Sequence, residues 1–255
     1  MLHSVKALHG FTVIATDGDI GTIQDVYFDD ARWTIRYLVV DTGGWLRGRK
    51  VLISPMSFSQ PDWEQEVIQV ELSREQVEQS PGLDTEKPIS RQQEEEFYRH
   101  YDYPLYWVGP LLWGFGAFPP IGGMFGRDKE ENKSADVATA AAPQAHVDSH
   151  LRSTNEVLGY HIRATDDAVG HVDDFLFDER DWSVQYMIVE TRNWLPGKHV
   201  LISPQRIQSV SWPDRHVFVN VTRDAIEGSP EYDADNPPPP EERSDLYRHP
   251  GPTDV

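Results

Sequence analysis

The sequence predicts an all-β protein made of two equivalent small barrels or sandwiches, and two observations carry this prediction. First, the 255-residue chain matches itself when it is shifted by 149 positions, which places Gly10 on Gly159 and the run 51–55 on 200–204. About 20 of the 46 positions in the range 10–55 are identical in this comparison. Second, short apolar runs alternate with glycine, proline and aspartate turn signals, and no long segment shows the period of a helix.

Each apolar run of the first copy predicts a strand, and these strands are expected at residues 11–15, 20–29, 33–41, 50–53 and 67–72. In the second of them the apolar positions change parity between Ile23 and Val26, and the second copy does the same. A repeated change of parity predicts a β-bulge, which curls a sheet. After the fifth strand, Ser73 and Gln76 have the spacing of a capping box, which predicts a helix of one or two turns ending before Ser80.

Both copies share a glycine-punctuated opening from Gly10 to Gly21, a strand that begins at Trp33 and the closing run Val-Leu-Ile-Ser-Pro. With the short capped helix, these features resemble the PRC-barrel family. The resemblance implies two compact six-stranded barrels, each followed by a short helix and joined by an irregular linker. It also implies docking onto other macromolecules. Members include the cytoplasmic part of the photosynthetic reaction-centre H subunit and the C-terminal domain of small-subunit ribosome-maturation factors.

The sequence shows neither the transmembrane helix of the H subunit nor the RNA-side domain of the maturation factors, so neither specific function is expected whole. The repeat and the composition predict five segments. They are a first barrel at 1–82, a short amphipathic helix and tail at 83–102, an aromatic stretch with an Ala-rich linker at 103–152, a second barrel at 153–231 and a Pro-rich tail at 232–255. The amphipathic helix is expected at Arg91–Tyr101, with a shorter counterpart at Glu241–His249.

The charge and the missing cysteine exclude several classes of protein. The chain carries 42 Asp and Glu against 23 Lys and Arg, a net charge of −19, and such a field repels nucleic-acid phosphates. The chain has no cysteine, which excludes disulfides, thiol nucleophiles and cysteine-ligated metal sites. No signal peptide is apparent, so we expect a cytoplasmic protein. A peripheral position at the inner membrane stays open because of the aromatic stretch.

That stretch, residues 103–126, contains no charged residue in 24 positions but has four prolines and six glycines. As a helix it would be long enough to cross a bilayer, although its prolines argue against this. Three interpretations stay open: a spanning helix, an aromatic patch that docks on a partner or membrane, and a linker that packs back onto a barrel. The candidate contacts are Tyr106, Trp107, Trp113 and Phe115.

A second candidate interface is the loop that holds Trp45 and Leu46 next to Arg49. The second copy repeats it with Trp194, Leu195 and Lys198. An aromatic anchor beside cationic donors is typical of an interface hot spot. The alternative is that the tryptophan covers the mouth of its own barrel.

No pattern predicts catalysis or metal binding. The run from Asp17 to Gly21 lacks the other ligands of a calcium loop, and His146 and His150 have no third ligand nearby. The sequence has no nucleophile elbow, phosphate loop or dinucleotide fingerprint. We therefore expect no catalytic residue, no cofactor and no metal, and a protein that is not an enzyme.

The sequence thus predicts a non-catalytic docking protein, an adaptor or scaffold, with protein partners of unknown identity. The alternative is a membrane-associated accessory of a photosynthetic or electron-transfer complex, similar to the H subunit. A third hypothesis is an enzyme with a site between the barrels. Assembly of the chain with copies of itself stays open.

Overall fold

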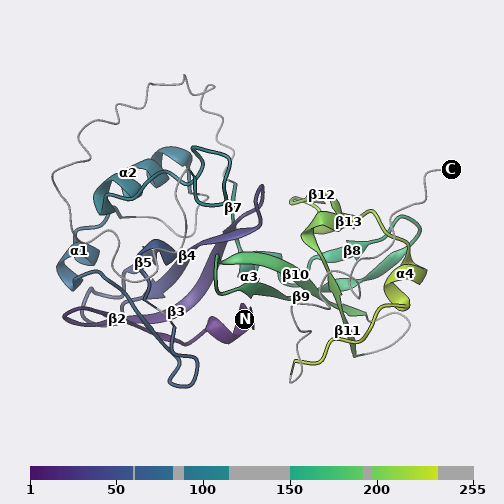
Figure 1. Cartoon of the computed structure of the whole chain (residues 1–255), viewed down its shortest axis with the longest axis horizontal. Coiled ribbons are helices and arrows are strands. Elements are labelled where there is room, and N and C mark those ends of the chain that lie inside the picture. The colour runs from purple at the N-terminus through teal and green to yellow at the C-terminus, as the bar shows by residue number, and fades with distance from the viewer. Residues whose placement is uncertain (60, 83–88, 115–149, 192–196, 235–255) are drawn as a thin grey trace. The chain divides into compact units, whose positions relative to one another are not determined.

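The computed structural model describes residues 1–59, 61–82, 89–114, 150–191 and 197–234 (Figure 1). These residues fall into two compact units. Unit 1 combines Met1–Gly10, Asp25–Arg36 and Arg152–Val255, and unit 2 combines Phe11–Gln24 and Tyr37–Leu151. Unit 1 therefore holds segments of the first copy together with the second copy.

Strands dominate and the helices are short, which confirms the predicted all-β fold. The strands of the first copy are β1 (Leu2–Ser4), β2 (Thr12–Ala15), β3 (Gly18–Asp29), β4 (Thr34–Asp41), β5 (Lys50–Ile53) and β6 (Val67–Gln69). Those of the second copy are β7 (Leu151–Ser153), β8 (His161–Arg163), β9 (Ala168–Asp178), β10 (Ser183–Thr191), β11 (Lys198–Ile202), β12 (Ile207–Ser211) and β13 (His216–Val219). The α-helices are α1 (Arg74–Glu78), α2 (Arg91–Tyr101), α3 (Thr154–Val157) and α4 (Arg223–Glu227). Single 3₁₀ turns are η1 (Lys6–Leu8), η2 (Pro55–Ser57) and η3 (Pro204–Arg206).

In unit 2, β2 pairs with β3 in antiparallel and with β6 in parallel orientation, and β4 pairs with β5 in antiparallel orientation. The predicted capping box at the start of α1 is present, since Ser73 and Gln76 each bond the other's backbone N–H. Helix α2 has the predicted bounds and packs on β4, where Tyr37 contacts Phe97 edge to face (Figure 1). The counterpart predicted at 241–249 lies outside the described residues.

Gly21 and Gly170, equivalent glycines of the repeated opening, lie where two neighbouring strands come too close for a side chain. A Cβ on Gly21 would lie 1.9 Å from the carbonyl oxygen of Asp41. A Cβ on Gly170 would lie 2.0 Å from the carbonyl oxygen of Glu190. Any larger residue at either position would push β3 from β4, or β9 from β10, so the same glycine closes both copies.

In unit 1, the strand order β12-β13-β8-β9-β10 continues into β4, and β11 pairs with β10. The pairing of β9 with β10 is interrupted between Ile188 and Val189, where the register steps from Asp174 to Val172. Asp173 is therefore the extra residue of a bulge. This confirms, in the second copy, the bulge predicted from the change of parity.

The sequence did not predict that the first strands of the two copies are exchanged. Strand β1 of the first copy pairs with β9 of the second, and β7 of the second pairs with β3 of the first. The hydroxyl of Ser4 donates to the carboxylate of Asp174. In the equivalent contact, Ser153 Oγ donates to Asp25 Oδ2 at 2.5 Å. The two contacts are related by the same shift of 149 positions, so the exchange is reciprocal.

Unit 1 also pairs equivalent residues of β4 and β10 directly. Thr34 is the register partner of Ser183, its own equivalent in the repeat. On either side, Ile35 N donates to the Trp182 carbonyl at 2.9 Å and Val184 N donates to the Trp33 carbonyl at 2.7 Å. These bonds form an antiparallel pair with local twofold symmetry.

Burial raises the pKa of the Asp174 carboxyl, although hydrogen bonds from Ser4, Phe175 N and Lys6 N lower it. We predict that lowering the pH from about 7 toward 3.8, the ordinary pKa of an aspartate, stabilises the wild type relative to the variant Asp174→Asn. The gain appears as the pH passes through the raised pKa of Asp174. The reason is that protonation removes a buried charge in the wild type only. Urea unfolding of both proteins across this pH range measures the effect, and a difference that does not change with pH contradicts it.

Candidate functional site

The predicted tryptophan loop is tied to unit 2. The indole N–H of Trp45 donates to the Ile20 carbonyl at 2.5 Å, and the Arg74 guanidinium lies 4.3 Å from the ring centroid. Trp45 and Leu46 are both half-buried. These contacts support the interpretation in which the tryptophan covers its own barrel. Trp194 and Leu195 lie outside the described residues.

The cations beside these loops bind the ends of the short helices. Arg49 donates to the carbonyl of Glu78, the last residue of α1, at 3.0 Å and to the carbonyl of Ser80 at 2.6 Å. Lys198 donates to the equivalent carbonyls of Glu227 and Ser229, at 3.0 and 2.8 Å, just past α4. A cation at this position satisfies carbonyls that the end of a helix leaves without an intrahelical donor. Arg49 and Lys198 thus share a role inside the fold.

A buried carboxylate connects α2 to the aromatic stretch in unit 2. Glu94 accepts hydrogen bonds from the hydroxyls of Tyr37 at 3.1 Å and Tyr106 at 2.8 Å. The guanidinium of Arg91 lies 2.9 Å from the other carboxylate oxygen and also donates to the Tyr106 hydroxyl. The side chain of Glu94 is almost fully buried. This network fixes the aromatic stretch to the helix and to β4.

Burial extends the pH range over which the neighbouring tyrosines stay protonated. It raises the pKa of Tyr37 well above its ordinary value, and it raises the pKa of Tyr101 to about 12. A protonated hydroxyl is a donor, which is the role that Tyr37 has toward Glu94. Tyr37 therefore remains a donor to Glu94 at any physiological pH.

We call residues 104–114 the aromatic turn. Tyr106 and Trp113 are buried, and the Arg91 guanidinium lies 4.3 Å from the ring of Trp107. At the end of the turn a Cβ on Gly114 would lie 2.8 Å from the Leu105 carbonyl oxygen, so only glycine lets the turn close this tightly.

Two aliphatic side chains of the aromatic turn face solvent: Val108 is 38% exposed and Leu111 is 53% exposed. The sequence selected the aromatic residues of this stretch as contacts, because size and ring chemistry are visible in a sequence. Tyr106 and Trp113 instead anchor the turn, and the exposed residues were missed. Phe115 lies outside the described residues.

The aromatic turn is not a membrane-spanning helix, since residues 103–114 contain no helix. None of the helices within the described ranges combines the length and the apolar character needed to cross a bilayer. The packing of Tyr106 and Trp113 agrees with the third interpretation, a stretch that packs back onto its barrel. Residues 115–126 lie outside the described part of the chain.

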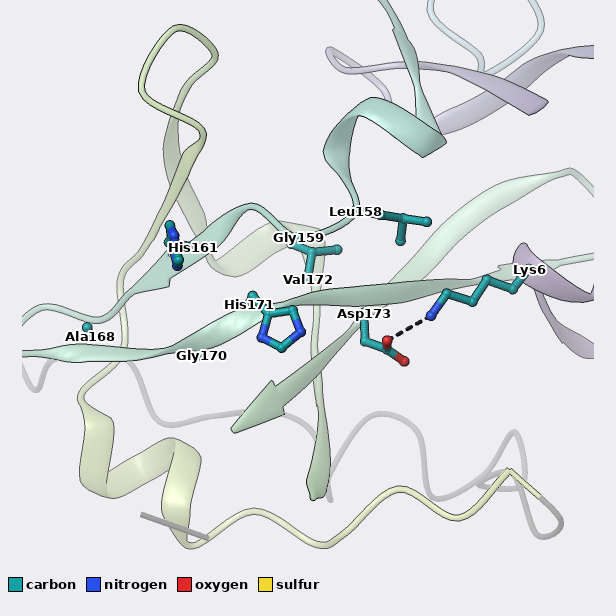
Figure 2. A pocket seen from close by; sticks show the side chains of 9 residues that line it. All are labelled: Lys6, Leu158, Gly159, His161, Ala168, Gly170, His171, Val172 and Asp173. Carbon is teal, nitrogen blue, oxygen red and sulfur yellow. Dashed lines mark hydrogen bonds and ion pairs between the residues drawn. The ribbon is translucent and has the colours of Figure 1, made fainter. Parts of the chain in front are cut away.

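Unit 1 contains a pocket of about 550 Å³ beside β8 and β9, lined by both polar and apolar residues. Figure 2 shows His171 and Asp173 projecting from β9, with His161 on the neighbouring strand. The ammonium of Lys6, which follows β1, lies 2.7 Å from Asp173 Oδ1. This pocket was not predicted from the sequence, because its residues His161, His171 and Asp173 have Thr12, Thr22 and Gln24 as equivalents and so form no repeated motif.

One family model matches the chain twice. This model, the PRC-barrel domain, covers residues 2–76 and 151–226. The chain belongs to the PRC-barrel family. None of the curated proteins compared with the chain is similar enough to be a relative.

The two PRC-barrel domains begin at the exchanged strands, since the matches start at β1 and β7. Each PRC-barrel domain thus places its first strand against the β3 or β9 strand of the other domain. Helix α2 and the aromatic turn lie after the first matched range and are additions to that domain. The pocket residues from Leu158 to Asp173 lie within the second PRC-barrel domain.

We predict that Glu94→Ala lowers the free energy of unfolding by about 3–5 kcal/mol, because it removes the shared acceptor of two buried hydroxyls and a guanidinium. The aromatic turn should then be cleaved faster in limited proteolysis. Glu96→Ala is the matched control, since Glu96 is exposed on the same helix and loses the same charge. The control should change stability by no more than about 0.5 kcal/mol. Equal effects of the two variants contradict the role of the network.

Proposed function

We propose that this protein is a non-catalytic docking protein whose contact surface is the exposed part of the aromatic turn. The observation that carries this proposal is the exposure of Val108 and Leu111 on a turn anchored by buried Tyr106 and Trp113. Large apolar side chains at an exposed position form favourable contacts when a partner covers them. A turn that is already ordered loses little further conformational entropy on binding.

The distribution of exposed apolar residues supports this choice. Among the described residues, the large hydrophobic side chains with the highest exposure are Met1, Val108, Leu111 and Phe218. Two of the four lie three positions apart on the aromatic turn. Trp107 lies between the anchor Tyr106 and Val108 and is half-buried under Arg91, so it extends the same apolar surface.

The charge of the chain indicates what kind of partner fits. A net charge of −19 favours a protein with an apolar cleft and a rim of basic side chains, because complementary charge speeds encounter and rejects acidic competitors. The same charge acts against anionic lipid headgroups. We therefore place the protein in the cytoplasm with a protein partner, and we propose no catalytic step.

The alternative, a membrane-associated accessory of an electron-transfer complex, uses the same surface. A half-buried tryptophan next to exposed aliphatic residues is also typical of a segment at a membrane interface. Flotation with zwitterionic vesicles distinguishes the two functions. Recovery of the full-length protein with the vesicles, lost in the turn variant below, supports the alternative over the docking function.

We predict that the double variant Val108→Asp and Leu111→Asp loses about tenfold or more of the binding of its partner, since buried apolar anchors carry most of the energy of an interface. Quantitative co-purification from the source cells measures this loss. Phe218→Asp is the control, because it places the same charge on an exposed apolar residue of unit 1.

Urea unfolding confirms that both variants fold. Partners retained equally by the double variant and the wild type contradict the assignment of this surface. The assignment is also contradicted if the double variant and Phe218→Asp lose their partners to the same extent, because added negative charge alone would then explain the loss of binding.

A further inference from the structure

Five titratable side chains form a continuous row across five strands of unit 1. The backbone register pairs His216 with His161 and His161 with His171. It then pairs His171 with Glu190 and Glu190 with His199. Directly paired residues project on the same face of a sheet, so the row brings four imidazoles and a carboxylate together. Imidazole and carboxylate groups are ligands of zinc and related transition metals.

The fold does not require these histidines. The equivalent row of the first copy is Val67, Thr12, Thr22, Asp41 and Lys50, which contains no histidine. By contrast, the serine and the aspartate that connect the exchanged strands are the same in both copies, Ser4 with Asp174 and Ser153 with Asp25. The row is therefore a feature of the second PRC-barrel domain alone.

At one end of the row, three side chains have the arrangement of a metal site. Ligand atoms of Asp173, Glu190 and His199 all lie within 4.8 Å of one another. His199 Nε2 is 3.6 Å from Asp173 Oδ2. The three side chains are 31%, 23% and 36% exposed, respectively, so an ion from solvent can reach them. If each ligand atom moved by about one ångström, the distances between the three atoms would match those between ligands of a tetrahedral ion. The bonds from such an ion to its ligands are about 2.0–2.2 Å long.

The backbone helps to build this arrangement. Asp173 is the extra residue of the β9 bulge, and bulges often redirect a side chain toward a site. Glu190 and His199 are opposite each other on β10 and β11, which fixes their spacing. His171 Nε2 lies 3.1 Å from Glu190 Oε2, so the imidazole can orient this carboxylate beside His199. Carboxylate ligands of metals are commonly held by such a neighbour.

We infer that the second PRC-barrel domain binds one divalent transition-metal ion of the zinc class through Asp173, Glu190 and His199. His171 is a positioning residue for Glu190. Three protein ligands leave one tetrahedral position for water. The pocket of Figure 2 adjoins the site, because the ligand Asp173 and the positioning residue His171 are among its lining residues. The inference does not rest on the docking function proposed above.

Lys6 opposes this ion and provides a specific test. Its ammonium lies 2.7 Å from Asp173 Oδ1, while Oδ2 is the oxygen that faces His199. The Lys6 side chain is 46% exposed and can turn into solvent when an ion binds. Removing the charge of Lys6 should strengthen metal binding. If these residues formed only a network of ion pairs, the same change would remove a partner of Asp173 and would have no effect on metal binding.

The experiment titrates the tag-free full-length protein, after treatment with a chelator, with zinc chloride in a calorimeter. The expected result is one zinc ion per chain. His199→Lys and Asp173→Gln are the test variants, since the first copy carries Lys50 and Gln24 at these positions and folds with them. Both should abolish the stoichiometric site. His171→Ala should weaken binding by about 10- to 100-fold, as is typical when a partner of a ligand is removed. Lys6→Met should bind more tightly than wild type.

His216→Ala is the matched control, because His216 lies at the far end of the same row and should leave zinc affinity unchanged. Cobalt absorption provides a second readout, since a tetrahedral site gives intense visible bands that His199→Lys should lose. The inference is overturned if wild type binds no stoichiometric zinc, or if His199→Lys binds zinc as well as wild type. It is also overturned if His216→Ala weakens binding as much as His171→Ala does, because the ion would then be held by scattered imidazoles.

Discussion

The pairing of Thr34 with Ser183 constrains the rest of unit 1. Because each residue faces its own equivalent, the segments on either side must meet their equivalents in the same way. The reciprocal contacts of Ser4 with Asp174 and of Ser153 with Asp25 follow this symmetry. The repeat therefore does more than provide two copies of a barrel. It also provides the strands with which each copy completes the other.

Strands, turns and short helices were largely predictable, because each is specified by a local pattern. The capping box of Ser73 and the amphipathic helix Arg91–Tyr101 depend on residues a few positions apart. The exchange of β1 and β7 was not predictable, since three-residue strands have no period and their partners lie far along the chain. The same holds for the candidate sites: Tyr106 and Trp113 are buried while Val108 and Leu111 are exposed, and which residues face the barrel depends on the fold of the turn rather than on residue type. The row of histidines becomes visible only when the register is known.

The two PRC-barrel domains keep the same scaffold and differ in what they carry. The first is followed by α2 and the aromatic turn, which Glu94 fixes to the barrel. The second carries the imidazole row on a face where the first has Thr12, Thr22 and Lys50. Cations at Arg49 and Lys198, and glycines at Gly21 and Gly170, serve the scaffold in both. Comparing the copies position by position thus separates residues that build the barrel from residues that give each domain its own surface.

The pairing of β1 with β9 has a consequence for how the protein is made. Leu2–Ser4 is synthesised long before its register partners Leu176–Asp178, so the two strands pair only after the residues between them have been translated. The first barrel therefore spends this interval with its opening strand unpaired, and unit 1 completes its fold only late in translation. Contacts between such distant parts of a chain also slow folding. Until β9 is available, the backbone groups of Leu2–Ser4 that it pairs are hydrogen-bonded to water instead.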